Sequence, residues 1–270
     1  MKTKIKISAV LIICTMLFGC ITAMIDIGGY KLGIRKTGTG QPTVVLESGL
    51  GAGHDHWTDV QAAIEQQTTV MSYDRAGIGQ SEASPNERTA KNMAIELHTL
   101  LEKSQTPPPY VLVGHSLGGF IIRMFADMYP DEVAAMVYVD GSHEDYYTYL
   151  QSTMTEEEWQ ELKQKEAQQM AFAPEAIKQE KALFSVSEEQ VRNTVIPDVP
   201  FIALSSSKTS PPYVTEEVIE TFQGMHASLV EQVSPENGIH IIVEDTGHNI
   251  ATENPEAVID AIKTALEMVE

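Results

Sequence analysis

Gly114, Ser116 and Gly118 form a G-x-S-x-G pattern near the middle of the chain. This spacing is typical of a sharp turn from a strand into a helix, where a serine hydroxyl is held exposed as a nucleophile. Glycines suit such a turn because the nucleophile has strained backbone angles, and neighbours without a Cβ let strand and helix close around it. The pattern predicts nucleophilic chemistry at Ser116.

The segments on either side of this short pattern support the prediction. Residues 110–113 are a short apolar run rich in β-branched residues, which favours a buried parallel strand. Residues 117–129 are apolar almost all round and stop at Pro130, as a buried helix does. Strand, turn and helix are therefore all expected around Ser116.

A serine hydroxyl needs a base within hydrogen-bond reach, and His248 is the best placed of the eight histidines. It lies in D-T-G-H-N-I (residues 245–250), between the last predicted strand and the final helix, so it can reach the strand ends where Ser116 is expected. His115 is expected to point elsewhere on the turn. His98, His226 and His240 fall within helix or strand patterns, so ordinary structural roles are expected for them.

The elements that position these residues alternate along the chain from Ile25 onward, which predicts a largely parallel sheet covered on both faces. An antiparallel hairpin with its turn at Gly28-Gly29 is expected first. The other predicted strands cover residues 43–47, 69–73, 110–113, 133–139, 200–205 and 239–243, and the predicted helices include residues 57–66, 89–103 and 255–268.

Residues 141–199 interrupt this alternation and are far longer than an ordinary connection. A polar helix over residues 155–170 and a helix start at Ser187 are predicted there, with Trp159, Met170, Phe172 and Phe184 forming an apolar face. We expect a helical lid over the site, inserted into a core made of residues 25–140 and 200–270.

Three stretches together resemble the α/β-hydrolase superfamily: V-L-V-G-H-S-L-G-G at 111–119, Y-D-R-A-G-I-G-Q-S at 73–81 and T-G-H-N-I at 246–250. The resemblance runs in order from Ile25 to the C-terminus. It implies the α/β-hydrolase fold, a mostly parallel sheet flanked by helices with an inserted helical lid, and activity similar to serine esterases and lipases. The family order of Ser, then Asp or Glu, then His matches Ser116 before His248.

The acidic residue is where the chain departs from the commonest family pattern. That pattern places it after the strand at 201–205, but no carboxylate follows there until Glu216. Some members, including certain lipases, carry the acid after the preceding strand, and this resemblance implies Asp140. Glu144 and Asp145 remain alternatives, whereas Asp245 is too close to His248 in the sequence, and a strand-end turn former is the alternative role for Asp140.

Acyl transfer also needs N–H donors for the oxyanion. One is expected to be Leu117, directly after the serine. The resemblance implies Leu50 as the other, because related enzymes carry His-Gly in the loop E-S-G-L-G-A-G at 47–53. Asp74-Arg75, with the glycines after them, is expected to brace the loop beneath the nucleophile.

No cofactor or metal is predicted. The glycines at 49, 51 and 53 lack dinucleotide-binding spacing, and the adjacent residues His54-Asp55-His56 cannot easily point at one ion.

Charge and the N-terminus bear on partners and location. Lys and Arg total 18 against 38 Asp and Glu, a formal net charge of -20, which argues against nucleic acid or anionic phosphate surfaces as partners.

Residues 1–24 carry three lysines before an apolar stretch, which indicates a bacterial-type export signal or membrane anchor. Cys20 resembles the lipidated cysteine of a lipobox, so an exported protein is expected, either anchored or secreted. Both cysteines, Cys14 and Cys20, lie in this segment, so no disulfide is expected in the folded domain.

The function predicted is hydrolysis of a small-molecule carboxylic ester through an acyl-enzyme, with Ser116, His248 and Asp140 in the catalytic roles. An amidase, an enzyme resembling the aminopeptidase branch that shares D-R-x-G-x-G-x-S, or a lactone hydrolase is the alternative. A binding protein on a hydrolase scaffold is the alternative of another class. Acyl length and oligomeric state are not predicted.

Overall fold

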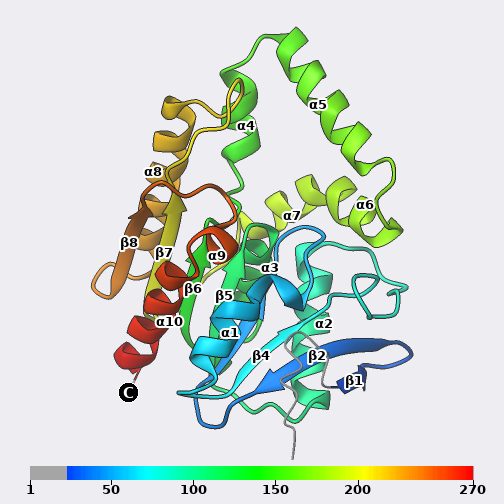
Figure 1. The fold of residues 1–270 in the computed structure, drawn as a ribbon, viewed down its shortest axis with the longest axis vertical. Helices are drawn as coiled ribbons and strands as arrows, with labels where there is room; N and C mark the ends of the chain where they lie inside the picture. Colours follow the sequence, from blue (N-terminus) through cyan, green and yellow to red (C-terminus); the bar gives the residue numbers. More distant parts are fainter. Residues whose placement is uncertain (1–22, 270) are drawn as a thin grey trace, which may run out of the picture.

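The computed structural model describes residues 23–269. Within this range a central sheet of eight strands has helices on both faces (Figure 1). The strand order across the sheet is β1-β2-β4-β3-β5-β6-β7-β8. The strands are β1 (Ala23–Asp26), β2 (Lys31–Thr37), β3 (Thr43–Glu47), β4 (Val70–Tyr73), β5 (Tyr110–His115), β6 (Val133–Val139), β7 (Phe201–Ser206) and β8 (Gly238–Val243).

Strands β3 to β8 run parallel, whereas β1 and β2 form an antiparallel hairpin that joins the sheet beside β4. This arrangement confirms the predicted fold class. The hairpin begins at Ala23, slightly before the expected start of the core at Ile25. Asp26 accepts the N–H groups of Gly28 and Gly29 in its turn, both of which have positive φ.

Helices cover the two faces of the sheet separately. The helices of the core are α1 (Thr58–Ile64), α2 (Ala90–Lys103), α3 (Leu117–Met128), α8 (Glu216–Val233), α9 (Ile250–Glu253) and α10 (Pro255–Val269), with 3-10 turns η1 (His54–Trp57) and η2 (Pro130–Glu132). Val111 and Val113 of β5 pack into the apolar cluster beneath α1 and α10, whereas Tyr110 and Leu112 belong to the cluster beneath α2 and α3. Side chains alternate along a strand, so β5 serves both halves of the core.

The predicted lid region contains α4 (Tyr146–Ser152), α5 (Glu156–Met170), α6 (Glu175–Ala182) and α7 (Phe184–Val191), which rise above one end of the strands (Figure 1). Thr155 and Glu158 form a capping box that starts α5. The expected apolar face forms only in part, because Phe184 packs on Phe120, whereas Phe172 is 97% exposed and α5 buries no residue. The helix start expected at Ser187 is also wrong: Ser187 lies inside α7, and its Oγ accepts the N–H of Ala90.

The predicted N-terminal export segment, including Cys20, lies outside the described residues, apart from Ala23 and Met24 in β1. Between residues 23 and 269, no helix has the length and apolar character needed to cross a membrane. Export and lipidation therefore stay predictions.

Candidate active site

Ser116 sits on the turn between β5 and α3, at φ 52° and ψ -121°. A Cβ at Gly114 would lie 2.7 Å from the carbonyl oxygen of Gly118, and one at Gly118 would lie 2.5 Å from that of Glu47. Only glycine fits at these two positions, because the obstructing atoms are backbone. The turn thus has the close strand-helix approach that the sequence predicted, and it presents Ser116 at the carboxyl end of β5.

A hydrogen-bonded chain joins the three residues singled out in the sequence. His248 Nε2 lies 3.0 Å from Ser116 Oγ, and His248 Nδ1 lies 2.7 Å from Asp140 Oδ2. Because the Asp140 carboxylate accepts from Nδ1–H, Nε2 is left to accept the Ser116 hydroxyl proton. The three residues come from the ends of β5 and β6 and from the loop after β8.

Asp140 is buried and held by β7 as well as by His248. The N–H of Ser206 donates to Oδ1 at 2.8 Å, and the Ser206 hydroxyl donates to Oδ2 at 3.0 Å. Burial alone would raise the pKa of Asp140, but His248, followed by His226 and the N–H of Ser206, outweighs burial and holds the pKa below its ordinary value. Asp140 has φ 42°, a conformation that Asp and Asn adopt more readily than most residues.

The two alternative acids bind arginines instead. Glu144 accepts two hydrogen bonds from Arg123, at 2.6 and 2.9 Å. Asp145 pairs with Arg192 at 2.7 Å. Burial would raise the pKa of Glu144, but Arg123 prevails and lowers it to about 2. Both carboxylates are therefore engaged away from His248.

His115 holds the loop that carries His248, a role that the sequence analysis did not predict. Its Nε2–H donates to the carbonyl of His248 at 2.8 Å, and its ring stacks on His56. Burial, followed by the charges of His248 and His56, lowers the pKa of His115 to about 3, so its ring is neutral. The position of His115 next to Ser116 is the signal that the sequence offers for this role. The sequence does not show its partner, because His248 is 133 residues away.

His226 is the second histidine whose role the sequence analysis missed. Its Nε2–H donates to the carbonyl of Gly141 at 2.7 Å, so its Nδ1 accepts the Ser205 hydroxyl at 2.6 Å. His240 Nε2 in turn donates to Ser205 at 2.8 Å. Burial lowers the pKa of His226 to about 4. This neutral network fixes the chain directly after Asp140 and beside Ser206.

The glycine loop (residues 48–53) lies against Ser116. A Cβ at Gly49 would be 2.9 Å from His115 Nδ1 and 3.1 Å from Ser116 Cβ. Leu50, in the same loop, lines the pocket in front of Ser116. Within residues 23–269, the backbone N–H groups of Leu50 and Leu117 donate no hydrogen bond, so both remain available to a ligand.

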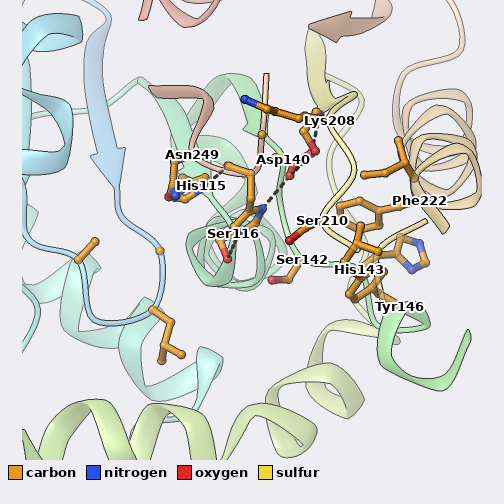
Figure 2. A pocket seen from close by; sticks show the side chains of 18 of the residues that line it. His115, Ser116, Asp140, Ser142, His143, Tyr146, Lys208, Ser210, Phe222 and Asn249 are labelled. Carbon is orange, nitrogen blue, oxygen red and sulfur yellow. Dashed lines mark hydrogen bonds and ion pairs between the residues drawn. The ribbon is translucent and has the colours of Figure 1, made fainter. Parts of the chain in front are cut away.

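A pocket of about 740 Å³ opens in front of Ser116. Figure 2 shows Ser116 facing it, with Tyr146 and Phe222 on its far side. Its apolar wall contains Leu50, Tyr146, Tyr147, Phe184, Val214, Ile219 and Phe222. Lys181 and Lys208 are its cationic lining residues, and Phe184 is the member of the predicted lid face that reaches it.

The residues His54-Asp55-His56 are engaged in other contacts. His54 Nδ1 bonds Asp74 Oδ1 at 2.8 Å, while the ring of His56 packs on those of Trp57 and His115. Across residues 23–269, no cluster of three or more His, Cys, Asp or Glu side chains is arranged to hold a metal ion.

Comparison with known proteins identifies the family. Residues 42–187 match the model of the alpha/beta hydrolase fold, which is more than half of the chain. The chain therefore belongs to the alpha/beta hydrolase fold family.

Two curated relatives and one solved structure illustrate the range of similar proteins. The uncharacterized protein YqjL of Bacillus subtilis is 28% identical over 230 residues, covering 84% of this chain and 85% of YqjL. RutD of Klebsiella pneumoniae, for which carbamate hydrolysis is proposed, is 38% identical over 103 residues, covering 38% of each protein. An esterase from Exiguobacterium antarcticum matches in structure with TM-score 0.65 and 14% identity, over 90% of this chain and 98% of the esterase. This last likeness concerns the fold.

Proposed function

We propose that the protein is a serine hydrolase that cleaves small-molecule carboxylic esters through an acyl-enzyme intermediate. The observation that carries the proposal is the hydrogen-bonded chain from Ser116 Oγ through His248 to Asp140, which faces a pocket with an apolar wall. Such a chain supplies a nucleophile, a base and a group that orients the base.

In the proposed reaction, Ser116 Oγ attacks the ester carbonyl carbon and its proton moves to His248 Nε2. The N–H groups of Leu50 and Leu117 donate to the oxygen that becomes negatively charged, and Asp140 stabilises the charged imidazole. The carbonyl re-forms as the alcohol leaves with the proton from His248. Water then attacks the acyl-enzyme and gives a proton to His248. As the tetrahedral intermediate collapses, His248 returns this proton to Ser116 Oγ and the carboxylic acid is released.

The lining of the pocket favours an ester over the substrate of an aminopeptidase. That alternative needs a lid carboxylate to bind a free amino group. Of the described lid residues that line the pocket, none is a carboxylate, and Lys181 adds a cation instead. The apolar wall fits an acyl or alcohol group, because burial of apolar surface contributes roughly 25 cal/mol per Å². We expect activity to depend on substrate chain length.

A fluorophosphonate probe tests the proposal, because it labels a serine that an adjacent base activates. We expect a covalent adduct at Ser116 on the wild-type protein and no adduct on Ser116→Ala. Aryl esters of increasing acyl length, with a matched anilide, a carbamate and a lactone, then define the preferred carbonyl. A folded wild-type protein without a Ser116 adduct would refute the proposal.

A further inference from the structure

The lid helix α6 lies directly on the glycine loop beside Ser116 and on the loop after β4. A Cβ at Gly51 would lie 3.0 Å from Ile177 Cδ1, and one at Gly77 would lie 2.5 Å from Ala176 Cβ. Gly51 and Gly77 have φ 69° and 77°. At both positions the absence of a side chain lets α6 approach the backbone. The contact therefore joins the lid to the glycine loop.

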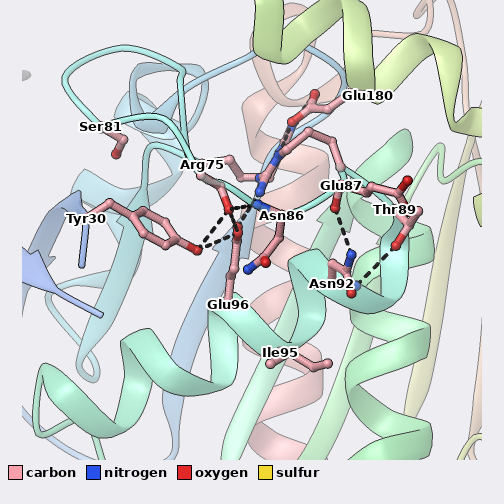
Figure 3. Close-up of polar contacts among 12 residues, drawn as sticks. Tyr30, Arg75, Ser81, Asn86, Glu87, Thr89, Asn92, Ile95, Glu96 and Glu180 are labelled. Atoms are coloured by element: carbon pink, nitrogen blue, oxygen red, sulfur yellow. Dashed lines mark hydrogen bonds and ion pairs between the residues drawn. The ribbon is translucent and has the colours of Figure 1, made fainter. Parts of the chain in front are cut away.

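Arg75 forms the polar centre of this contact. Its Nη1 donates to the carbonyl of Ser48 and its Nη2 to that of Gly49, both at 2.6 Å. Glu180 of α6 accepts from Arg75 Nε at 2.9 Å and from Nη2 at 3.0 Å (Figure 3). Glu180 Oε2 also accepts the N–H of Gly51 at 3.3 Å. Arg75 and Glu180 thus bind the backbone on both sides of Leu50.

Glu180 is one of two buried carboxylates bound to Arg75. Arg75 already pairs with Glu47 at 2.7 Å, and the hydroxyl of Tyr73 donates to the other oxygen of Glu47. Glu180 adds a second carboxylate to one guanidinium and has 0% of its surface exposed. Burial, together with the charge of Glu180, raises the pKa of Glu47. Glu180 differs from Glu47 in its hydrogen bond to the Gly51 N–H of the glycine loop.

We propose that Glu180 is a positioning residue for the oxyanion: from the lid, it holds Arg75 and Gly51 so that the Leu50 N–H points at the reacting carbonyl. The proposal rests on the proposed function. An oxyanion donor acts at about 2.7–3.1 Å from the charged oxygen. A displacement of about 1 Å can reduce the rate roughly 100-fold. Rigid bonds on both sides of Leu50 provide the required precision.

The same helix also contacts the substrate side. Lys181 follows Glu180 directly and lines the pocket, as does Phe184 just beyond α6. Glu180 thus contacts the loop that supplies the oxyanion donor, and Lys181, the next residue, lines the pocket. A change in the position of α6 relative to bound substrate is therefore expected to alter the rate of the chemical step.

Glu180→Gln tests the proposal, because the side chain keeps its size but turns an amide N–H₂ toward Arg75 or toward the Gly51 N–H. We expect kcat for an aryl ester to fall roughly 10- to 100-fold, with KM within about twofold. A trifluoromethyl ketone, which forms a tetrahedral oxyanion with an activated serine, should lose affinity by the same factor as kcat/KM. A purely structural role of Glu180 would not produce this parallel.

Glu144→Gln is the matched control, since it breaks another arginine pair at the base of the lid without contact to the glycine loop. We expect its kcat and inhibitor affinity to stay within about threefold of wild type. Wild-type values in Glu180→Gln, or equal losses in the two variants, would overturn the proposal.

If Glu180→Gln does not fold, Glu180→Asp keeps the charge and withdraws the carboxylate by one methylene. It should show a smaller loss in the same two quantities, and unchanged values would again overturn the proposal. Fluorophosphonate labelling of the wild-type protein separates this result from a failure of the proposed function.

Discussion

Asp140→Asn removes the charge next to His248 while preserving the surrounding geometry. Asparagine accepts positive φ, so the backbone at φ 42° is tolerated. The N–H of Ser206 donates to Oδ1 at 2.8 Å, so an oxygen must remain at that position. The new amide nitrogen is then placed at Oδ2, facing His248 Nδ1 and the Ser206 hydroxyl.

This placement reverses the proton positions on the ring. An amide N–H₂ donates to His248 Nδ1, so the ring proton moves to Nε2. A protonated Nε2 can no longer accept the proton of Ser116. The equivalent substitution in Ser-His-Asp enzymes lowers kcat about 10⁴-fold. We expect a loss of roughly 10³- to 10⁴-fold here, which corresponds to about 4–5.5 kcal/mol of transition-state stabilisation.

The assay is steady-state hydrolysis of an aryl ester at pH 7.5, with circular dichroism and thermal unfolding to establish folding. Glu144→Gln is the control for loss of a nearby carboxylate, and it should stay within about threefold of wild type. If Asp140→Asn folds and retains near-wild-type kcat, the orienting role of Asp140 is refuted and Glu144 or Asp145 becomes the candidate.

Three further predictions concern the side chains packed around Ser116 and Asp140. Gly49→Ala places a Cβ 3.1 Å from that of Ser116, so we expect kcat/KM to fall at least about tenfold, and an unchanged value would refute the tight contact. His115→Ala removes the donor to the His248 carbonyl, so we expect roughly a tenfold lower kcat with little change in KM. Steady-state kinetics measures both, and an unchanged kcat would show that this hydrogen bond does not position His248. His115 and His226 have pKa values of about 3 and about 4 when folded, below that of a free histidine, so the unfolded chain binds more protons on acidification. Stability should therefore fall as the pH drops from 7 to 5, by about 2 kcal/mol for each histidine. Urea unfolding at the two pH values measures this fall, His226→Gln should reduce it, and equal stabilities would contradict it.

The sequence predicted the architecture well because its signals were local. Short apolar runs bounded by turn residues located the parallel strands. The helix predicted over residues 89–103 is α2, which Thr89 caps by accepting the N–H of Asn92 on its Oγ. The lid was predicted less well. Its apolar residues do not form one face: Phe184 packs on Phe120 of the core, whereas Phe172 lies in solvent. Residue type alone does not show which apolar side chains find a partner.

The roles of the remaining site residues depend on contacts between distant parts of the chain. The sequence places His115 on the turn beside Ser116 and His226 in an ordinary helix or strand pattern, yet the two rings bind the carbonyls of His248 and Gly141. Arg75 was expected to brace the loop beneath Ser116, but its partner Glu180 is 105 residues away in a lid helix that the sequence analysis did not predict. A single sequence holds no signal for such a pair.

By itself, the sequence determined the strand-turn-helix around Ser116, because close packing there requires glycines at fixed spacing. It also placed His248 and Asp140 after the carboxyl ends of strands, and in a parallel sheet these ends lie along one edge. Only the tertiary structure decided which atoms meet: Asp140 rather than Glu144 at His248, and Glu180 on the glycine loop. These choices depend on how separate elements pack against one another, which local propensity does not determine.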